Sequence, residues 1–232
     1  MRTLTLLFAL LITLAAAPAA RAAGEATASG IPLDAPWKVA LHTWALAHVK
    51  HPAWGLAHSE RNYHTALRLA QQEGWTVDKD ALLAAALLHD VGGLAEFEHT
   101  GVDHAVRSVE IAEPLLTSWA FPGEKWPVVK EIILGHVYYG PAPTGHEALA
   151  FRDADLLDFL GAIGVARLAS ATPELGHGAT LATPFDAAAK FAVELPPKLS
   201  TKAAKAEAPA RVAEMQRFID AVRAYTHDGT AF

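Results

Sequence analysis

The 232-residue sequence contains no cysteine. The protein therefore cannot form disulfides, hold a metal through thiolates or use a cysteine nucleophile. A chain of this length can rely instead on one sizeable hydrophobic core. Twelve histidines stand out in the composition, and without thiolates a transition metal would have to be bound through imidazole nitrogens and carboxylate oxygens.

Long apolar runs are absent after the first 22 residues, so we expect no stable membrane span in that part of the chain. The N-terminus itself combines Arg2, an apolar stretch from Leu4 to Leu14 and the small-x-small site Ala20-Arg21-Ala22. This pattern is typical of a secretory signal peptide, and its apolar part is short for a membrane helix. We expect cleavage after Ala22 and an exported protein, periplasmic or secreted, with an uncleaved anchor as the alternative.

Basic residues are outnumbered, with 19 Lys and Arg against 25 Asp and Glu. Removal of Arg2 and Arg21 with the signal peptide leaves 17 basic residues against 25 acidic ones, a net charge of −8. Proteins that bind nucleic acid through its phosphates need an excess of positive charge. We therefore expect no nucleic-acid partner.

Sustained period-two alternation and internal repeats are also missing, whereas apolar residues recur at helical spacing from Trp37 to Tyr225. This periodicity predicts an all-α protein with one helical bundle domain. We expect a signal peptide at residues 1–22, a flexible tether at 23–36 and the helical domain at 37–232. Pro114 is expected to kink or divide a helix, and Pro209 to begin the last one.

The most informative stretch runs from Ala84 to Gly93, with the sequence AAALLHDVGG. An apolar helix there ends in an adjacent imidazole and carboxylate, His89 and Asp90. Burial penalises both groups unless a cation or a hydrogen bond compensates. The two glycines that follow allow the backbone to turn away from the pair. The alternative is that His89 and Asp90 only hydrogen-bond each other.

Three more polar residues lie in apolar helical surroundings, far apart in the sequence: His58, His136 and Asp155. If they come from different helices that converge, they can build a metal site in the way helical bundles do. A set of two imidazoles and two carboxylates suits Mn²⁺, Fe²⁺, Co²⁺, Ni²⁺, Zn²⁺ or Mg²⁺ and leaves positions for water. We predict that this set is His58, His89, Asp90 and Asp155.

The ordered set His…His-Asp…Asp resembles the HD-domain superfamily of metal-dependent phosphohydrolases. The resemblance runs from about Trp54 to Tyr225 and implies a helical bundle of the HD type with a divalent metal ion, or two. A metal in such a site lowers the pKa of a bound water and polarises a phosphoryl oxygen. The motifs that carry the resemblance are His58-Ser-x-Arg61, Leu-Leu-His89-Asp90-x-Gly, Asp103-His104-Ala-x-Arg107-Ser, Gly-His136 and Asp153-Ala-Asp155-Leu-Leu-Asp158.

The resemblance implies further roles near the metal. Asp90 would be a catalytic residue and could bridge to a second ion. His104 and His136 would complete that second site if two ions are bound. With one ion, His104 would instead contact the phosphate or shuttle a proton. His99 is a weaker candidate for the same duty because it lies on an expected loop.

Two arginines follow histidines by one helical turn and can lie on the same helix face. Arg61, after His58, could grip a substrate anion and is our third catalytic candidate, with a solvated arginine as the alternative. Arg107, after His104, could likewise bind a substrate anion or be a solvated arginine.

Carboxylates near the expected ligands have weaker assignments. Asp158 lies one turn after Asp155, so it either supports a ligand or sits on the helix surface. Asp153 is expected to be structural. Glu96 and Glu98 could act as a base, although loops often carry solvated carboxylates.

The chain departs from the superfamily pattern at Gly93, where many HD proteins carry lysine and single-metal nucleotidases carry glutamate. The Gly-Tyr-Pro signature of the cyclic-dinucleotide branch is also missing. We expect a phosphohydrolase acting on a small phosphate ester or anhydride, such as a nucleotide. The alternatives are an HD-type diiron oxygenase that uses His104 and His136, and a non-catalytic protein that binds a metal or ligand.

Overall fold

The computed structural model describes residues 26–172 and 180–227. The expected signal peptide lies outside these residues. Within them the chain forms nine α-helices and no β-strand beyond one isolated bridge, so the all-α prediction is confirmed. The α-helices are α1 (Pro36–His48), α2 (Leu56–Gln72), α3 (Lys79–Leu88), α4 (His104–Ser118), α5 (Trp126–Gly135), α6 (His146–Asp158), α7 (Gly161–Ser170), α8 (Ala182–Glu194) and α9 (Lys202–Tyr225). Short 3-10 helices are η1 (Val91–Gly93), η2 (Gly123–Lys125) and η4 (Pro196–Lys198).

Helix α3 is the centre of the core. Every residue from Ala81 to Leu88 is buried, so this helix is covered on all sides, as its continuous apolar sequence requires. The Asp78 carboxylate caps its N-terminus by accepting hydrogen bonds from the backbone N–H groups of Asp80 and Ala81. The covered helix delivers His89, the residue that follows it, directly into the protein interior.

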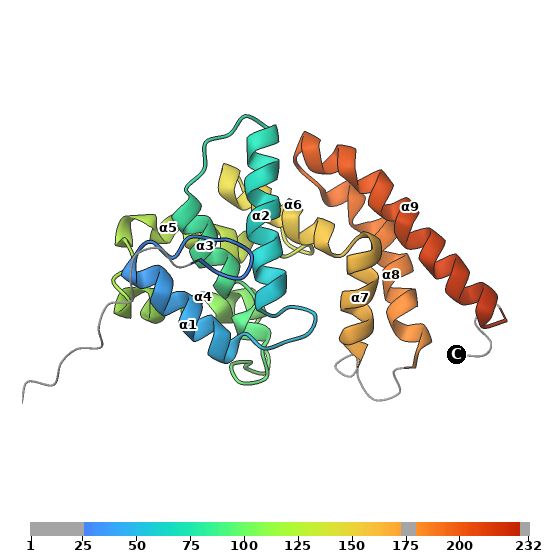
Figure 1. Ribbon diagram of the computed structural model, residues 1–232, viewed down its shortest axis with the longest axis horizontal. Coiled ribbons are helices and arrows are strands. Elements are labelled where there is room, and N and C mark those ends of the chain that lie inside the picture. Colours follow the sequence, from blue (N-terminus) through green and yellow to red (C-terminus); the bar gives the residue numbers. More distant parts are fainter. Residues whose placement is uncertain (1–25, 173–179, 228–232) are drawn as a thin grey trace, which may run out of the picture.

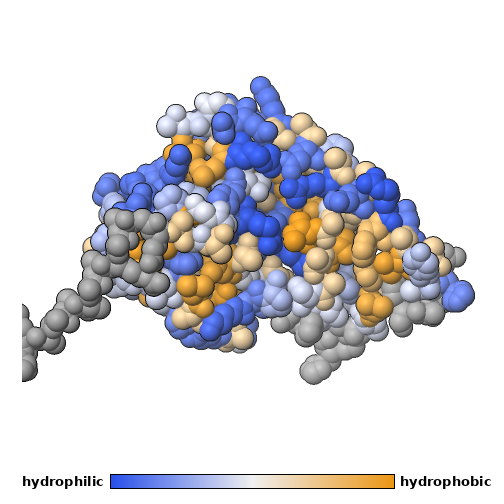
Figure 2. All heavy atoms as spheres, in the orientation of Figure 1, coloured by the Kyte–Doolittle hydropathy of each residue, from blue (hydrophilic) through white to orange (hydrophobic). Residues whose placement is uncertain are grey.

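Helix α6 lies between the two sides of the molecule (Figure 1). The helices α1 to α5 lie on one side and α7 to α9 on the other, and α6 contacts α2, α5, α7 and α9. On the α8 and α9 side, hydrophobic atoms show among hydrophilic ones at the surface (Figure 2). Residues carried by α2 and α6 therefore meet near the middle of the protein.

A single glycine reverses the chain between α6 and α7. Gly161 has φ of +75°, which a residue with a side chain rarely adopts. The bend separates α6 from α7 and lets α7 pack against both α8 and α9. It also brings α7 toward the N-terminal end of α2, where Arg167 of α7 contacts His58.

Two prolines lie inside helices: Pro114 does not divide α4, and α9 begins before Pro209. Pro114 lies inside α4 and Pro209 inside α9, and both helices continue through them. A proline removes one backbone donor, but buried residues on both sides of it hold the helix in place by tertiary packing. In α4 these are Ala112 and Leu116, and in α9 Ala208 and Met215.

The segment before α1, expected to be a tether, packs two side chains against the helices in its described part. Ile31 is 1% exposed and belongs to the hydrophobic core, and Leu33 is also buried. The Thr27 backbone N–H donates to the Ile31 carbonyl at 2.9 Å, which closes a turn around Gly30. Two apolar side chains in a polar, Gly-rich stretch are enough to anchor it. Among the described helices, none has the length and apolar character needed to cross a membrane.

Candidate metal centre

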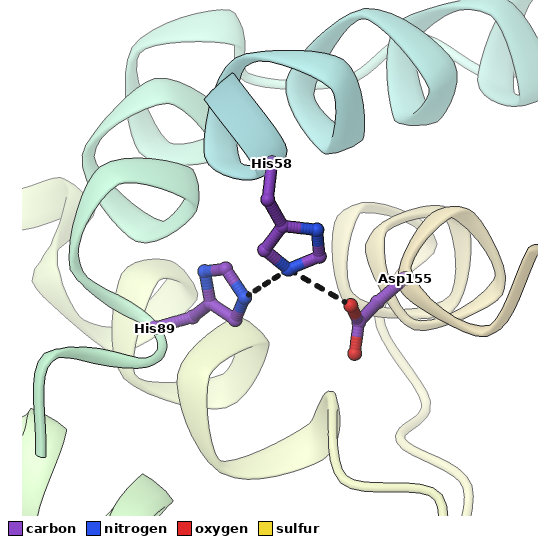
Figure 3. A group of neighbouring side chains, drawn as sticks. All are labelled: His58, His89 and Asp155. Atoms are coloured by element: carbon purple, nitrogen blue, oxygen red, sulfur yellow. Dashed lines mark hydrogen bonds and ion pairs between the residues drawn. The ribbon is translucent and has the colours of Figure 1, made fainter. Parts of the chain in front are cut away.

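The four predicted ligands meet at one place although they come from three parts of the fold. His58 lies in the first turn of α2, His89 and Asp90 follow the end of α3, and Asp155 lies in α6. The Nε2 atom of His58 is 3.3 Å from Nε2 of His89 and 3.2 Å from Oδ1 of Asp155 (Figure 3). We call His58, His89 and Asp155 the inner cluster; each is less than a tenth exposed.

The tautomers of His58 and His89 follow from the partner of the Nδ1 atom in each ring. Nδ1 of His89 is 2.9 Å from the Ala86 carbonyl oxygen, which can only accept, so Nδ1 must carry a proton. Nδ1 of His58 is 2.8 Å from Oδ2 of Asp158 and donates to it in the same way. In the neutral rings both Nε2 atoms therefore present lone pairs to each other and to a carboxylate. Such a set of unprotonated donors fits a metal ion.

The electrostatics of the site favour positive charge. Burial acts to lower the pKa of His89, but the carboxylates of Asp90 and Asp155 outweigh it and raise that pKa. Burial acts in the opposite direction on the Asp155 carboxyl, yet the neighbouring imidazoles, His58 first, lower its pKa to about 2. The carboxylates are thus ionised at neutral pH, and a proton or a cation must compensate them.

Asp90 faces two groups of ligands at once. Its Oδ2 lies 3.2 Å from Nε2 of His89 and 3.7 Å from Nε2 of His58. Its Oδ1 lies 3.3 Å from Nε2 of His136 and 3.5 Å from Nε2 of His104. We call Asp90, His104 and His136 the outer cluster. The two oxygens of one carboxylate can therefore serve two neighbouring metal positions.

The outer histidines are also oriented for ligation. Nδ1 of His136 donates to the Ile133 carbonyl at 2.6 Å, which leaves Nε2 unprotonated in the neutral ring. That Nε2 is 3.1 Å from Nε2 of His104. The Tyr139 hydroxyl donates to Asp103 at 2.5 Å, and its oxygen lies 3.3 Å from Nδ1 of His104. His104 is more open than the inner residues, with a third of its side chain exposed.

The first glycine of the His-Asp-Val-Gly-Gly motif is required by close packing. A Cβ on Gly92 would lie 2.3 Å from the His104 carbonyl oxygen and 2.6 Å from the Ser108 nitrogen. The Gly92 N–H also donates to the Ser108 hydroxyl at 2.9 Å. This contact fixes η1 on α4 and so places His104 beside Asp90. Gly93 is different, because a Cβ there would meet only ordinary contacts, the nearest being 3.5 Å away.

Asp158 supports His58 and is itself held by two arginines. Arg61 donates to both of its oxygens, from Nε at 3.0 Å and Nη2 at 2.9 Å. Nη1 of Arg167 lies 3.2 Å from its Oδ2. Burial acts to raise the pKa of Asp158, but the hydrogen bonds from His58 and Arg61 and the Arg167 charge hold it well below its usual range. A carboxylate of this kind fixes the ring orientation of a metal-binding histidine.

Other predicted site residues have partners of their own. Arg61 pairs with Asp158, the carboxylate that contacts His58. Arg107 donates to the Phe97 carbonyl and pairs with Glu110. Glu96 pairs with His48 at 3.0 Å. His99 and Glu98 are exposed.

Asp153 has the structural role that was expected of it. Its carboxylate accepts from the backbone N–H groups of Ser200 and Thr201, at 2.9 and 2.6 Å respectively, and from the Thr201 hydroxyl. It thereby fixes the start of α9 on α6.

Two residues that contact the inner cluster were not predicted from the sequence. Nδ2 of Asn62 donates to Oδ1 of Asp155 at 3.0 Å and lies 3.2 Å from Nε2 of His58. Arg167, in α7, lies 3.3 Å from the same His58 nitrogen through its Nη2. The spacing of Asn62 one turn after His58 was an available signal. Nothing in the sequence near Arg167 relates it to the motif residues.

A cavity of about 290 Å³ opens beside Asp90 and His104. Its walls also include Trp54, Gly93, Phe159 and Arg167. Larger hollows occur on the surface, but the one of about 620 Å³ lies between α2 and the start of α3, away from both clusters. The cavity beside Asp90 is therefore the one that a reacting molecule could use.

Comparison with known proteins agrees with this site. Residues 55–160 match the model of the HD domain. A crystal structure of a Lactobacillus plantarum protein is 26% identical, covers 81% of this chain and 95% of its own, and has a TM-score of 0.62. A predicted HD superfamily hydrolase from an uncultured Thermotogales bacterium is also 26% identical, with 81% and 91% covered and a TM-score of 0.55.

A curated relative extends the comparison only in part. An uncharacterized protein of Clostridium beijerinckii is 29% identical over 83 residues, or 34% of this chain. The match spans about half, 52%, of that relative's length. The HD match includes His58, His89, Asp90, His104, His136 and Asp155 and stops before Arg167. By the match of residues 55–160, this part of the chain belongs to the HD-domain superfamily.

Proposed function

We propose that the protein is a metal-dependent hydrolase that acts on a small phosphate ester or anhydride, such as a nucleotide. The observation that carries this proposal is the convergence of imidazole nitrogens and carboxylate oxygens beside a cavity of about 290 Å³. The likeness to an HD superfamily hydrolase at 26% identity supports the reaction class. The substrate would be small because the cavity is small.

The inner cluster and Asp90 would hold the ion. A bound divalent ion supplies a polarised phosphoryl oxygen and a water of lowered pKa. The protein's part is orientation: Asp158 fixes the His58 ring, the Ala86 carbonyl fixes His89, and Asn62 holds one oxygen of Asp155. These contacts keep three of the four donor groups in place before the ion arrives, which reduces the cost of ordering them.

The outer cluster would hold a second ion that shares Asp90 with the first. Oδ1 of Asp90 and the Nε2 atoms of His104 and His136 lie within 3.5 Å of one another. Two ions that share a carboxylate are a known arrangement for displacement at phosphorus. The same donor set suits two irons, so the diiron oxygenase stays the second candidate.

The first experiment measures metal content and activity together. The purified protein is analysed for bound metals, stripped with a chelator and reloaded in turn with Mn²⁺, Fe²⁺, Co²⁺, Ni²⁺, Zn²⁺ or Mg²⁺. Phosphate release is then measured on a panel of nucleotides, sugar phosphates and an aryl phosphate. A His89→Ala/Asp90→Ala variant should lose the metal and the activity, whereas His99→Ala, which removes an exposed histidine, should keep both.

The outcomes separate the candidates. Metal-dependent phosphate release that is lost in the double variant supports the proposal. Two irons with turnover that requires O₂ would replace it with the oxygenase. Metal binding without turnover of any panel member would favour a binding protein. A protein that holds no metal after reloading would contradict the whole assignment.

We also propose that the protein is exported, on the sequence of its first 22 residues alone. Cell fractionation and N-terminal sequencing of the native protein test this. A mature N-terminus at Ala23 in an extracytoplasmic fraction is expected. An intact Met1 in the cytoplasm would contradict it.

A further inference from the structure

Arg167 is a buried arginine that the HD match does not include. It lies in α7, beyond the matched residues 55–160, and only 3% of its side chain is exposed. The turn at Gly161, with φ of +75°, folds α7 back so that this side chain reaches the inner cluster. Burial of a guanidinium is costly unless its donors and its charge are used.

Part of the guanidinium is accounted for by fixed partners. Nε donates to the Ala53 carbonyl at 2.6 Å, and the group lies over the Phe159 ring, 4.1 Å from its centre. Nη1 is 3.2 Å from Oδ2 of Asp158 but makes no hydrogen bond of acceptable geometry. These contacts set the position of the side chain and leave the outer N–H groups incompletely used.

The contact between Arg167 and His58 cannot persist when His58 binds a metal. Nη2 of Arg167 lies 3.3 Å from Nε2 of His58. That nitrogen has one lone pair, and its Nδ1 proton is directed to Asp158. The lone pair can go to Arg167 or to an ion, but not to both. Metal binding therefore deprives a buried cationic donor of its acceptor and calls for a new one close to the ion.

The cavity beside the site supplies the space for that acceptor. Arg167 lines it together with Asp90 and His104, which are ligands of the outer cluster. Gly93 contributes no side chain to the same wall. Arg167 is thus a cation on the cavity wall, with an Nη1 that makes no hydrogen bond and an Nη2 whose acceptor, His58, would be taken by a metal.

We propose that Arg167 is a substrate-binding residue that donates hydrogen bonds to the oxygens of a phosphoryl group held at the metal centre. This inference rests on the proposed function and adds a residue from outside the matched domain. A guanidinium suits the task because its planar set of donors matches the geometry of phosphate oxygens. Arg61, which the sequence suggested for this role, donates hydrogen bonds to both carboxylate oxygens of Asp158.

The test measures binding of inorganic phosphate to the metal-loaded protein by calorimetry. In Arg167→Gln, phosphate should bind about 10- to 100-fold more weakly, as expected for loss of a charge-assisted hydrogen bond, while the metal stoichiometry stays that of the wild type. Arg167→Lys should lose less, because it keeps the charge. Arg211→Gln is the matched control, since Arg211 likewise bonds a backbone carbonyl, that of Leu157, and lies outside the cavity wall.

Three results would overturn the inference. The first is unchanged phosphate affinity in Arg167→Gln with metal retained. The second is loss of metal in both Arg167 variants, which would make the residue a support for His58 and Asp158. The third is an equal loss of phosphate affinity in Arg211→Gln. Circular dichroism melting identifies a variant that fails to fold, and Arg167→Lys then carries the test.

The inference and the proposed function can fail separately. If the wild type releases phosphate from esters but Arg167→Gln binds phosphate as well as it does, only the inference is wrong. If the wild type hydrolyses no ester, yet binds phosphate in a metal-dependent manner that requires Arg167, only the proposed function is wrong.

Discussion

The inner and outer clusters share Asp90 but differ in how they are built. The inner residues, His58, His89 and Asp155, lie in or directly after covered helices and are each less than a tenth exposed. In the outer cluster, His104 begins α4 with a third of its side chain exposed. Its supporting residue Tyr139 is 56% exposed.

The clusters also differ in what fixes their rings. Strong, buried partners hold the inner histidines, namely the Asp158 carboxylate at 2.8 Å and the Ala86 carbonyl at 2.9 Å. In the outer cluster the buried His136 is held in the same way by the Ile133 carbonyl at 2.6 Å, but Nδ1 of His104 has a long contact of 3.3 Å to the Tyr139 hydroxyl. Preorganised, desolvated ligands bind a metal more tightly than mobile, hydrated ones. We therefore expect the inner position to retain its ion and the outer position to exchange it.

The largest effect should come from Asp158→Asn. The amide of asparagine accepts a weaker hydrogen bond from His58 than a carboxylate does, and the substitution removes a negative charge beside two arginines. The inner metal should therefore bind about 10- to 100-fold more weakly. Competition with a chelator measures the affinity. The exposed Asp220→Asn on α9 is the control and should match the wild type. An unchanged inner affinity would show that ring orientation does not depend on Asp158.

Next in size is the effect of His104→Ala. Removing this outer ligand should lower the metal content from two ions to one, because the inner donors do not depend on His104. Elemental analysis after gel filtration at graded metal concentrations gives the stoichiometry. Loss of both ions would contradict this comparison, because it would mean that the inner and outer positions bind their ions together through the shared Asp90.

A smaller effect is expected from Tyr139→Phe. The change removes the hydroxyl that links Asp103 to Nδ1 of His104. One hydrogen bond near the surface contributes on the order of 1 kcal/mol, so the outer ion should bind about two- to tenfold more weakly. The inner affinity should not change. Weakening of the inner position instead would contradict the assignment of Tyr139 to the outer cluster.

The smallest effect concerns an ion-pair group outside both clusters. Asp80 contacts Lys38 and Lys125, each at 2.8 Å. Burial acts to raise the pKa of Asp80, but the two lysines, Lys125 first, lower it below its ordinary value of 3.8. Its contribution to stability is thus present above pH 3.8 and is lost as the pH falls through the lower folded-state pKa.

Asp80→Asn should therefore melt slightly below the wild type at neutral pH, and the difference should shrink as the solution is acidified. Thermal melts of the metal-free proteins between pH 7 and pH 2 measure this. A difference that grows on acidification would show the opposite sign of the pKa shift. Metal affinity at both clusters should be unchanged in this variant.

The sequence by itself determined the all-α fold and indicated the histidines and carboxylates that the structure brings together. Apolar spacing predicts helices because each one buries a single face, and α3 was evident because its apolar run has no polar face at all. The order His58, His89-Asp90, Asp155 indicated the ligands, because a buried carboxylate or imidazole in an apolar helix needs a compensating charge. Features of this kind depend on neighbouring residues, so they can be predicted from short segments of the sequence.

The tertiary structure alone decided the partners of charged side chains. Arg61 and Arg167 both contact the buried Asp158, yet the side chain of Arg61 is 38% exposed, whereas that of Arg167 is 3% exposed and lines the cavity. The difference depends on the turn at Gly161 and on how α7 packs against α8 and α9. A long side chain can reach many neighbours, so only the packing of distant helices selects among them, and the sequence pattern does not encode that choice locally.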